Sequence, residues 1–177
     1  LRHDIGKYLL AMQALVEENN SQKASEVLTQ AQNALENCDR LVDVDHAVLN
    51  VILSEYLHRA SEEEIVLKMD VQVPPTLSVA TVDLYILLGN TLDNAIAACR
   101  EVPVGQRYIN LQLRLHHNVL FYQLENPYQE AYHMRQREKG HGYGLHNVRQ
   151  CLEKYHGDME IEKQNGCYRF CAHLNST

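Results

Sequence analysis

The sequence predicts an α-helical hairpin in residues 1–42 and a mixed α/β domain in residues 43–177. Apolar residues recur twice at helical spacing before residue 42, whereas strand-like alternation begins only near residue 65. With 45% hydrophobic and 22% charged residues, the 177-residue chain can build a packed core, and global disorder is excluded. Helices should therefore come first and a sheet-containing domain second.

The first two helices are expected to form a hairpin. Residues 1–18 carry an apolar stripe at i, i+3, i+4 spacing, and a second stripe runs through residues 24–41. The polar residues 19–21 separate the stripes and offer an N-cap for the second helix. One hairpin cannot cover both stripes, so we expect a homodimer that forms a four-helix bundle through residues 1–42.

The rest of the chain alternates between helical and strand patterns. Residues 42–45 are predicted to be a linker, and Pro74 and Pro75 end the first strand. Asn165 and Gly166 give a hairpin turn signal. The polar, aperiodic residues 127–139 are expected to form a mobile loop. The patterns predict helices over residues 47–60, 79–99 and 144–155, and strands over residues 65–73, 109–115, 119–124, 159–162 and 168–174.

Charge and composition exclude several classes of protein. A formal net charge of −7 argues against binding to nucleic acid or to an anionic membrane. No run approaches 18 apolar residues, so no part of this sequence is expected to span a membrane. The five cysteines form no CxxC pattern and are expected to be reduced core thiols. Because Leu1 opens within a helical pattern and no initiator Met is present, we expect a longer parent protein.

Two asparagines mark the predicted helix 79–99. Asn90 and Asn94 are four residues apart, so they share the helix face opposite the apolar residues. Carboxamide oxygens suit Mg²⁺ or a water-mediated contact with phosphate. For two asparagines alone, an ordinary solvated face is the alternative interpretation.

A glycine-rich segment, residues 139–145, precedes the predicted helix 144–155. Gly140, Gly142 and Gly144 alternate, which lets the backbone approach a ligand closely, and a helix N-terminus favours anionic phosphate. Lys139 could add a positive charge. The segment matches neither the P-loop nor the GxGxxG pattern, and a simple turn is the alternative.

A histidine near the start is a candidate nucleophile. His3 lies on the side of the first helix opposite its apolar stripe, so it should be exposed. The neighbouring Asp4 could orient the imidazole or accept its proton. An exposed histidine with no chemical role is the alternative.

Together, residues 1–4, 89–96 and 139–145 resemble in order and spacing the H, N and G2 boxes of histidine kinases. The resemblance covers essentially the whole chain and is strongest to GHKL-type sensor kinases of Gram-positive bacteria, which include receptors for quorum-sensing peptides. It implies a Bergerat-type α/β two-layer sandwich in residues 43–177 and an autophosphorylating protein-histidine kinase of a two-component system. It also implies that the chain is the cytoplasmic portion of a bacterial sensor, anchored in the plasma membrane by a segment that precedes this sequence.

The resemblance also assigns roles by position. His3 would be the phosphoacceptor, with Asp4 as its acid/base partner, and would pass the phosphoryl group to an aspartate of a response regulator. Asn90 would position water or phosphate, and Asn94 would hold Mg²⁺ bridging the phosphates of ATP. Residues 127–139 would be the ATP lid. The phosphates would be cradled by Lys139, Gly140, His141, Gly142, Tyr143, Gly144 and Leu145.

Two positions depart from the common family pattern. Most relatives read the adenine amino group with an Asp; here we expect Asn126 in that role, with Glu125 as the second candidate. Lys7 stands where relatives often carry an Asn four residues after the phosphoacceptor, so we expect weak or absent phosphatase activity toward the regulator.

Three other functions compete with the kinase. A phosphotransfer or scaffold dimer with a decayed ATP site is disfavoured by the intact asparagine pair and glycines. Hydrolysing ATPases of the same fold use a glutamate base where this chain has Asn90, which favours transfer over hydrolysis. A non-enzymatic dimerisation module would bind no adenine nucleotide.

Overall fold

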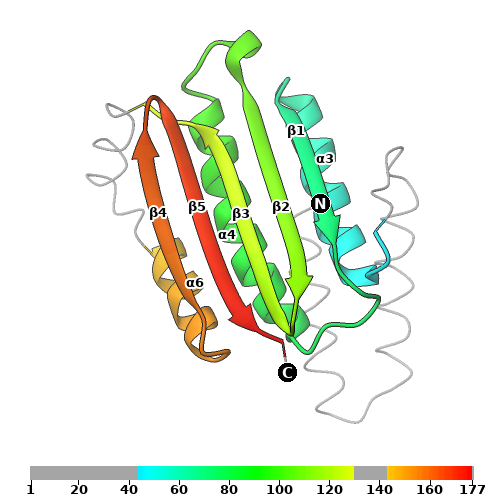
Figure 1. Ribbon diagram of the computed structural model, residues 1–177. Helices are drawn as coiled ribbons and strands as arrows, with labels where there is room; N and C mark the ends of the chain where they lie inside the picture. Colours follow the sequence, from blue (N-terminus) through cyan, green and yellow to red (C-terminus); the bar gives the residue numbers. More distant parts are fainter. Residues whose placement is uncertain (1–43, 130–142, 177) are drawn as a thin grey trace.

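The computed structural model describes residues 44–129 and 143–176. The predicted hairpin of residues 1–42, with His3, Asp4 and Lys7, lies outside these residues. So do positions 139–142 of the glycine-rich segment. The described residues form a two-layer α/β sandwich in which helices cover one face of a five-stranded sheet (Figure 1).

The order of elements follows the predicted alternation. The helices are α3 (Ala47–Glu62), α4 (Thr81–Cys99) and α6 (Tyr143–Glu153), with a short 3₁₀ helix η1 (Val104–Gln106). The strands are β1 (Val66–Gln72), β2 (Tyr108–His116), β3 (Val119–Pro127), β4 (Asp158–Gln164) and β5 (Cys167–Asn175).

The sheet is mixed, with strand order β1-β2-β3-β5-β4. β1 pairs in parallel with β2 through the crossover helix α4, and the other pairs are antiparallel. Both antiparallel hairpins have two-residue turns with positive φ, at His117 and Asn118 and at Asn165 and Gly166. These dihedrals match the turn that suits the twist of a hairpin, so the Asn-Gly prediction is confirmed.

The core lies between the sheet and the helix layer. α4 contributes the fully buried Leu88 and Leu92, and β3 contributes Tyr122 and Leu124. Alternation along the strands places one apolar row against the helices. Inside this core the Tyr122 hydroxyl has a polar partner, because Thr91 Oγ1 lies 2.8 Å from it.

The observed bounds differ from the predicted ones mainly at element ends. β3 runs three residues past its predicted end at 124 and includes Pro127, which pairs only with Cys167 of β5. Pairing with β2 stops at Glu125, so the missing N–H of the proline removes no ladder bond on that side. α6 ends at Glu153 rather than Tyr155, and the chain then turns through His156 at φ 51°.

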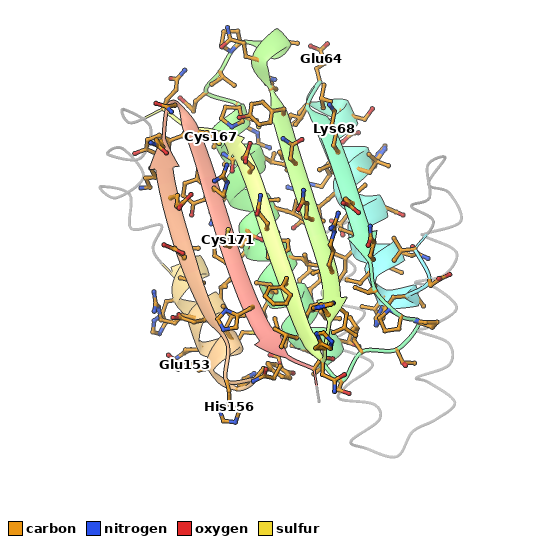
Figure 2. All side chains as sticks on the ribbon, in the orientation of Figure 1. Glu64, Lys68, Glu153, His156, Cys167 and Cys171 are labelled. Carbon is orange, nitrogen blue, oxygen red and sulfur yellow. The ribbon has the colours of Figure 1, made fainter. Side chains whose placement is uncertain are left out.

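The sheet face opposite the helices carries polar and charged side chains. Arg169 of β5 pairs with Glu125 of β3 and Glu162 of β4, each at 3.1 Å. Cys167 and Cys171 also lie on this open face (Figure 2), where partial burial raises the pKa of each thiol.

Of the four cysteines that the structure describes, two lie in the core as predicted. The free thiols of Cys99 and Cys151 are buried as expected, whereas those of Cys167 and Cys171 are half-buried on the open face. Cys38 lies outside the described residues. Within residues 44–129 and 143–176, no helix is long and apolar enough to cross a membrane.

Candidate functional site

The start of α6 packs directly against the asparagine face of α4. A Cβ atom added to Gly144 would lie 2.9 Å from Asn90 Oδ1, closer than such contacts occur. Asn90 Nδ2 donates to the Ile86 carbonyl at 2.7 Å, which fixes the orientation of the amide. Two predicted motifs that are 54 residues apart in the sequence (144 − 90) therefore meet at one side chain.

Asn94 lies one turn further along α4 than Asn90. It is exposed, whereas Asn90 is half-buried, and both are on the side of the helix away from the buried Leu88 and Leu92. The predicted separation of polar and apolar faces is therefore present in the structure.

α3 is joined to the same turn of α4. The Tyr56 hydroxyl lies 3.1 Å from Asp93 Oδ1 and 3.2 Å from the Gly89 carbonyl oxygen. Arg59 donates to the same Asp93 oxygen at 3.1 Å, and its guanidinium lies 4.7 Å from the Tyr56 ring centroid. These bonds hold the α4 turn that carries the asparagine pair against α3.

The two candidates for the adenine-reading residue lie on opposite faces of β3. Asn126 is 2% exposed, and period-two alternation puts it on the helix-covered face with Leu124. Its Nδ2 donates to the Pro127 carbonyl at 2.8 Å. Glu125 points to the open face and pairs with Arg169. Only Asn126 therefore shares a face with α4.

The structure describes only some of the remaining predicted site residues. Tyr143 and Gly144 begin α6, and Leu145 is half-buried against the core. Lys139, Gly140, His141 and Gly142, like His3 and Asp4, lie outside the described residues.

A charged cluster that the sequence analysis missed links α4 and α6. Asp83 is 5% exposed and accepts hydrogen bonds from Lys154 and Tyr155. Sequence spacing could not connect residues 83 and 154. The sequence does contain one indication that Asp83 is unusual. It is four residues before the buried Leu87, which places a charge on the apolar side of the helix.

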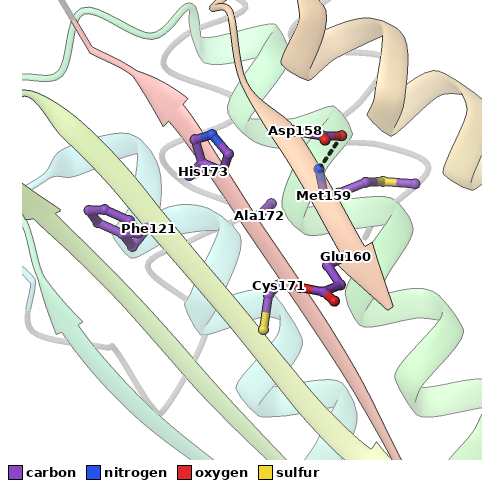
Figure 3. A pocket seen from close by; sticks show the side chains of 7 residues that line it. All are labelled: Phe121, Asp158, Met159, Glu160, Cys171, Ala172 and His173. Carbon is purple, nitrogen blue, oxygen red and sulfur yellow. Dashed lines mark hydrogen bonds between the residues drawn. The ribbon is translucent and has the colours of Figure 1, made fainter. Parts of the chain in front are cut away.

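A groove of about 400 Å³ lies on the open face of the sheet, away from these helices (Figure 3). Phe121, 49% exposed, forms part of its wall. The full lining is Phe121, Asp158, Met159, Glu160, Cys171, Ala172 and His173. None of the predicted site residues is among them, so this groove is separate from the candidate site.

Comparison with known proteins agrees with this architecture. No curated protein matches the chain. Among solved structures, the catalytic domain of the histidine kinase ThkA is similar, with 15% identity and a TM-score of 0.57 over 73% of this chain and 90% of that one. The histidine kinase AdeS of Acinetobacter baumannii has 15% identity and a TM-score of 0.55 over 99% of this chain and 98% of that one.

At such low identity these structures show the fold alone, whereas a family model shows the family. The GHKL domain model matches residues 79–173, more than half of the chain. This segment runs from just before α4 to β5 and includes Asn90, Asn94, Asn126 and Gly144. The chain therefore belongs to the GHKL domain family and has the α/β sandwich fold of histidine kinase catalytic domains.

Proposed function

We propose that the chain is an ATP-dependent protein-histidine kinase that phosphorylates its own His3. The observation that carries the proposal is the contact between Asn90 of α4 and Gly144 of α6. A Cβ on residue 144 would crowd the Asn90 amide, so glycine lets the start of α6 lie beside the asparagine face of α4, where the N–H groups of a helix N-terminus favour phosphate. Membership of the GHKL family supports ATP as the ligand.

The residues present fit a magnesium nucleotide. Asn94 offers an exposed amide oxygen, a hard donor that Mg²⁺ accepts. In the described part of the chain, no three His, Cys, Asp or Glu side chains are grouped to hold a metal ion by themselves. The other ligands would therefore come from the phosphates and water, as is usual for Mg²⁺. Bound there, Mg²⁺ would neutralise charge on the phosphates.

The nucleotide base needs a polar partner of its own. Asn126 is a buried amide at the end of β3, on the face that the helices cover. An amide can both donate to and accept from a base edge, which makes it suitable for adenine. We propose Asn126 for this role. The ion pair of Glu125 with Arg169 on the open face of the sheet favours Asn126 over Glu125 for this role.

Transfer of the phosphoryl group to His3 does not require a side chain that activates water as a base. A neutral imidazole nitrogen of His3 attacks the γ-phosphorus; the N–P bond forms, the bond from that phosphorus to the bridging oxygen breaks, and ADP leaves. Asp4 stabilises the positive charge that develops on the ring or accepts its proton. Asn90 has no carboxylate with which to activate water, so transfer is favoured over hydrolysis.

The proposal also includes two protein partners, a second copy of the chain and a response regulator. Residues 1–42 would form the homodimer, and phosphorylated His3 would pass its phosphoryl group to an aspartate of a response regulator. The parent protein would be a membrane-anchored bacterial sensor, and this chain its cytoplasmic portion. These assignments rest on the resemblance of the three motifs to sensor kinases.

Labelling with γ-labelled ATP and Mg²⁺ tests the reaction. The wild-type chain should acquire acid-labile, base-stable label, which His3→Gln and Asn94→Ala should both abolish. His173→Gln, a matched substitution at an exposed position on the open face, should leave labelling intact. A wild-type chain that binds ATP and releases phosphate without becoming labelled would contradict the kinase and favour hydrolysis.

A further inference from the structure

The buried carboxylate of Asp83 joins the beginning of α4 to the end of α6. Asp83 Oδ1 accepts from Lys154 Nζ at 2.8 Å, and Oδ2 accepts from the Tyr155 hydroxyl at 2.7 Å. The Asp83 side chain is 7% exposed, whereas that of Lys154 is 59% exposed. Both carboxylate oxygens of a nearly buried group are therefore occupied by residues that directly follow α6.

Tyr155 also completes the N-terminus of α4. Ala80, the N-cap residue, provides no side-chain cap, and its N–H donates to the Tyr155 hydroxyl at 3.0 Å. The Cys151 thiol lies 3.5 Å from the Asp83 carbonyl oxygen. Tyr155 thus bridges the backbone and the first-turn carboxylate of α4. We refer to Asp83, Lys154 and Tyr155 as the clamp.

The other end of α6 carries the contact with Asn90. α6 spans 11 residues, or about 16 Å of helix, from Gly144 at the candidate phosphate site to the clamp. Between the two ends, Val148 and Leu152 are buried in the core. A helix that is held at its far end keeps its near end in place, where a Cβ on Gly144 would already lie too close to Asn90 Oδ1.

Stabilising the fold would not by itself require a carboxylate that is bonded by both Lys154 and Tyr155. The charge pair itself should contribute little stability, because the Lys154 side chain is 59% exposed and water screens its attraction to Asp83. Directional bonds from two side chains to one carboxylate do specify where the end of α6 lies relative to α4. The geometry therefore favours positioning over simple stabilisation.

We infer that Asp83, Lys154 and Tyr155 are positioning residues that hold the N-terminus of α6 against Asn90 and thereby set affinity for the phosphate portion of a nucleotide. This inference rests on the proposed function. None of the three residues needs to touch the nucleotide. Loosening the clamp should weaken binding of a ligand that carries phosphates and spare a ligand that carries only the base and sugar.

The test compares ADP with adenosine, titrated in the presence of Mg²⁺ and followed by NMR chemical shifts. In Asp83→Asn and Tyr155→Phe, affinity for ADP should fall by on the order of tenfold, while affinity for adenosine stays within about twofold. Lys154→Met, which alters a side chain that is more than half exposed, provides a milder variant if the others unfold. Lys154→Arg should behave as wild type.

Tyr122→Phe is the matched control, because it removes a buried hydroxyl that contacts α4 at Thr91, away from the clamp. It should leave the ratio of ADP to adenosine affinity unchanged. Folded clamp variants with wild-type affinity for ADP, or with equal losses for both ligands, would overturn the inference while leaving the proposed function standing. A wild-type chain that binds neither ligand would overturn the proposed function and the inference together.

Discussion

Asn90 Oδ1 occupies space that a side chain on Gly144 would need, at 2.9 Å from the ideal Cβ position. Gly144→Ala should therefore displace the Asn90 amide and lower affinity for Mg²⁺-ATP by about tenfold. Alanine is the better helix former by about 1 kcal/mol, so stability should not fall much. Isothermal titration and thermal unfolding separate the two effects.

Gly105→Ala is the control for that substitution. A Cβ at residue 105 meets nothing within 4 Å, so both affinity and stability should match wild type. Unchanged affinity in Gly144→Ala would show that this close approach does not matter for nucleotide binding.

Substitutions of the adjacent residues Glu125 and Asn126, on opposite faces of β3, should affect affinity for ATP differently. Asn126→Leu should reduce affinity for ATP by about tenfold or more, because a polar contact to the base is lost. Glu125→Gln alters only the ion pair with Arg169 on the open face and should leave the affinity within about twofold. Equal losses in the two variants, measured by the same titration, would contradict the assignment of Asn126.

The bond from Tyr56 to α4 should contribute to stability. Tyr56→Phe removes a buried hydroxyl that lies 3.1 Å from Asp93 Oδ1 and leaves the ring in place. We expect the free energy of unfolding to fall by about 1–2 kcal/mol in urea denaturation. Arg59→Met, which breaks a partly exposed pair, should cost less, about 0–1 kcal/mol. The reverse order would show that the ion pair, rather than the hydroxyl, joins the two helices.

Asp83 should make stability sensitive to acid. Burial acts to raise the pKa of Asp83, but hydrogen bonds from Lys154 and Tyr155 outweigh it and hold the pKa below its ordinary value of 3.8. A lowered pKa in the folded state means that the stabilisation is complete above pH 3.8 and is lost as pH falls through the lower folded value. The stability difference between wild type and Asp83→Asn should therefore shrink below pH 4 in urea titrations. A difference that stays constant with pH would show that the carboxylate charge contributes nothing.

Periodicity predicted the fold of residues 44–129 and 143–176 well because each of their elements carries its own local signal. The helical stripe of residues 79–99 and the Asn-Gly turn at residues 165–166 are examples. The ends of elements were less predictable, since they depend on neighbours. β3 extends to Pro127 because β5, and not β2, pairs with it there.

Only the residues of the candidate site that belong to local sequence motifs could be predicted. Asn90, Asn94 and Gly144 were identified from their spacing, and the structure brings Asn90 and Gly144 together. Asp83 and Lys154 are 71 residues apart, and no local pattern links them. The choice between Asn126 and Glu125 needed the strand's orientation, because adjacent strand residues point to opposite faces.

We propose that the asparagine face of α4 and the start of α6 form a magnesium-nucleotide site. Isothermal titration of the wild-type chain with ATP and Mg²⁺ tests it most directly, alongside Asn94→Ala and the matched Asn110→Ala on the open face of β2. We expect one saturable site in wild type and Asn110→Ala, and loss of Mg²⁺-dependent binding in Asn94→Ala. No binding by wild type, or unchanged binding by Asn94→Ala, would contradict it.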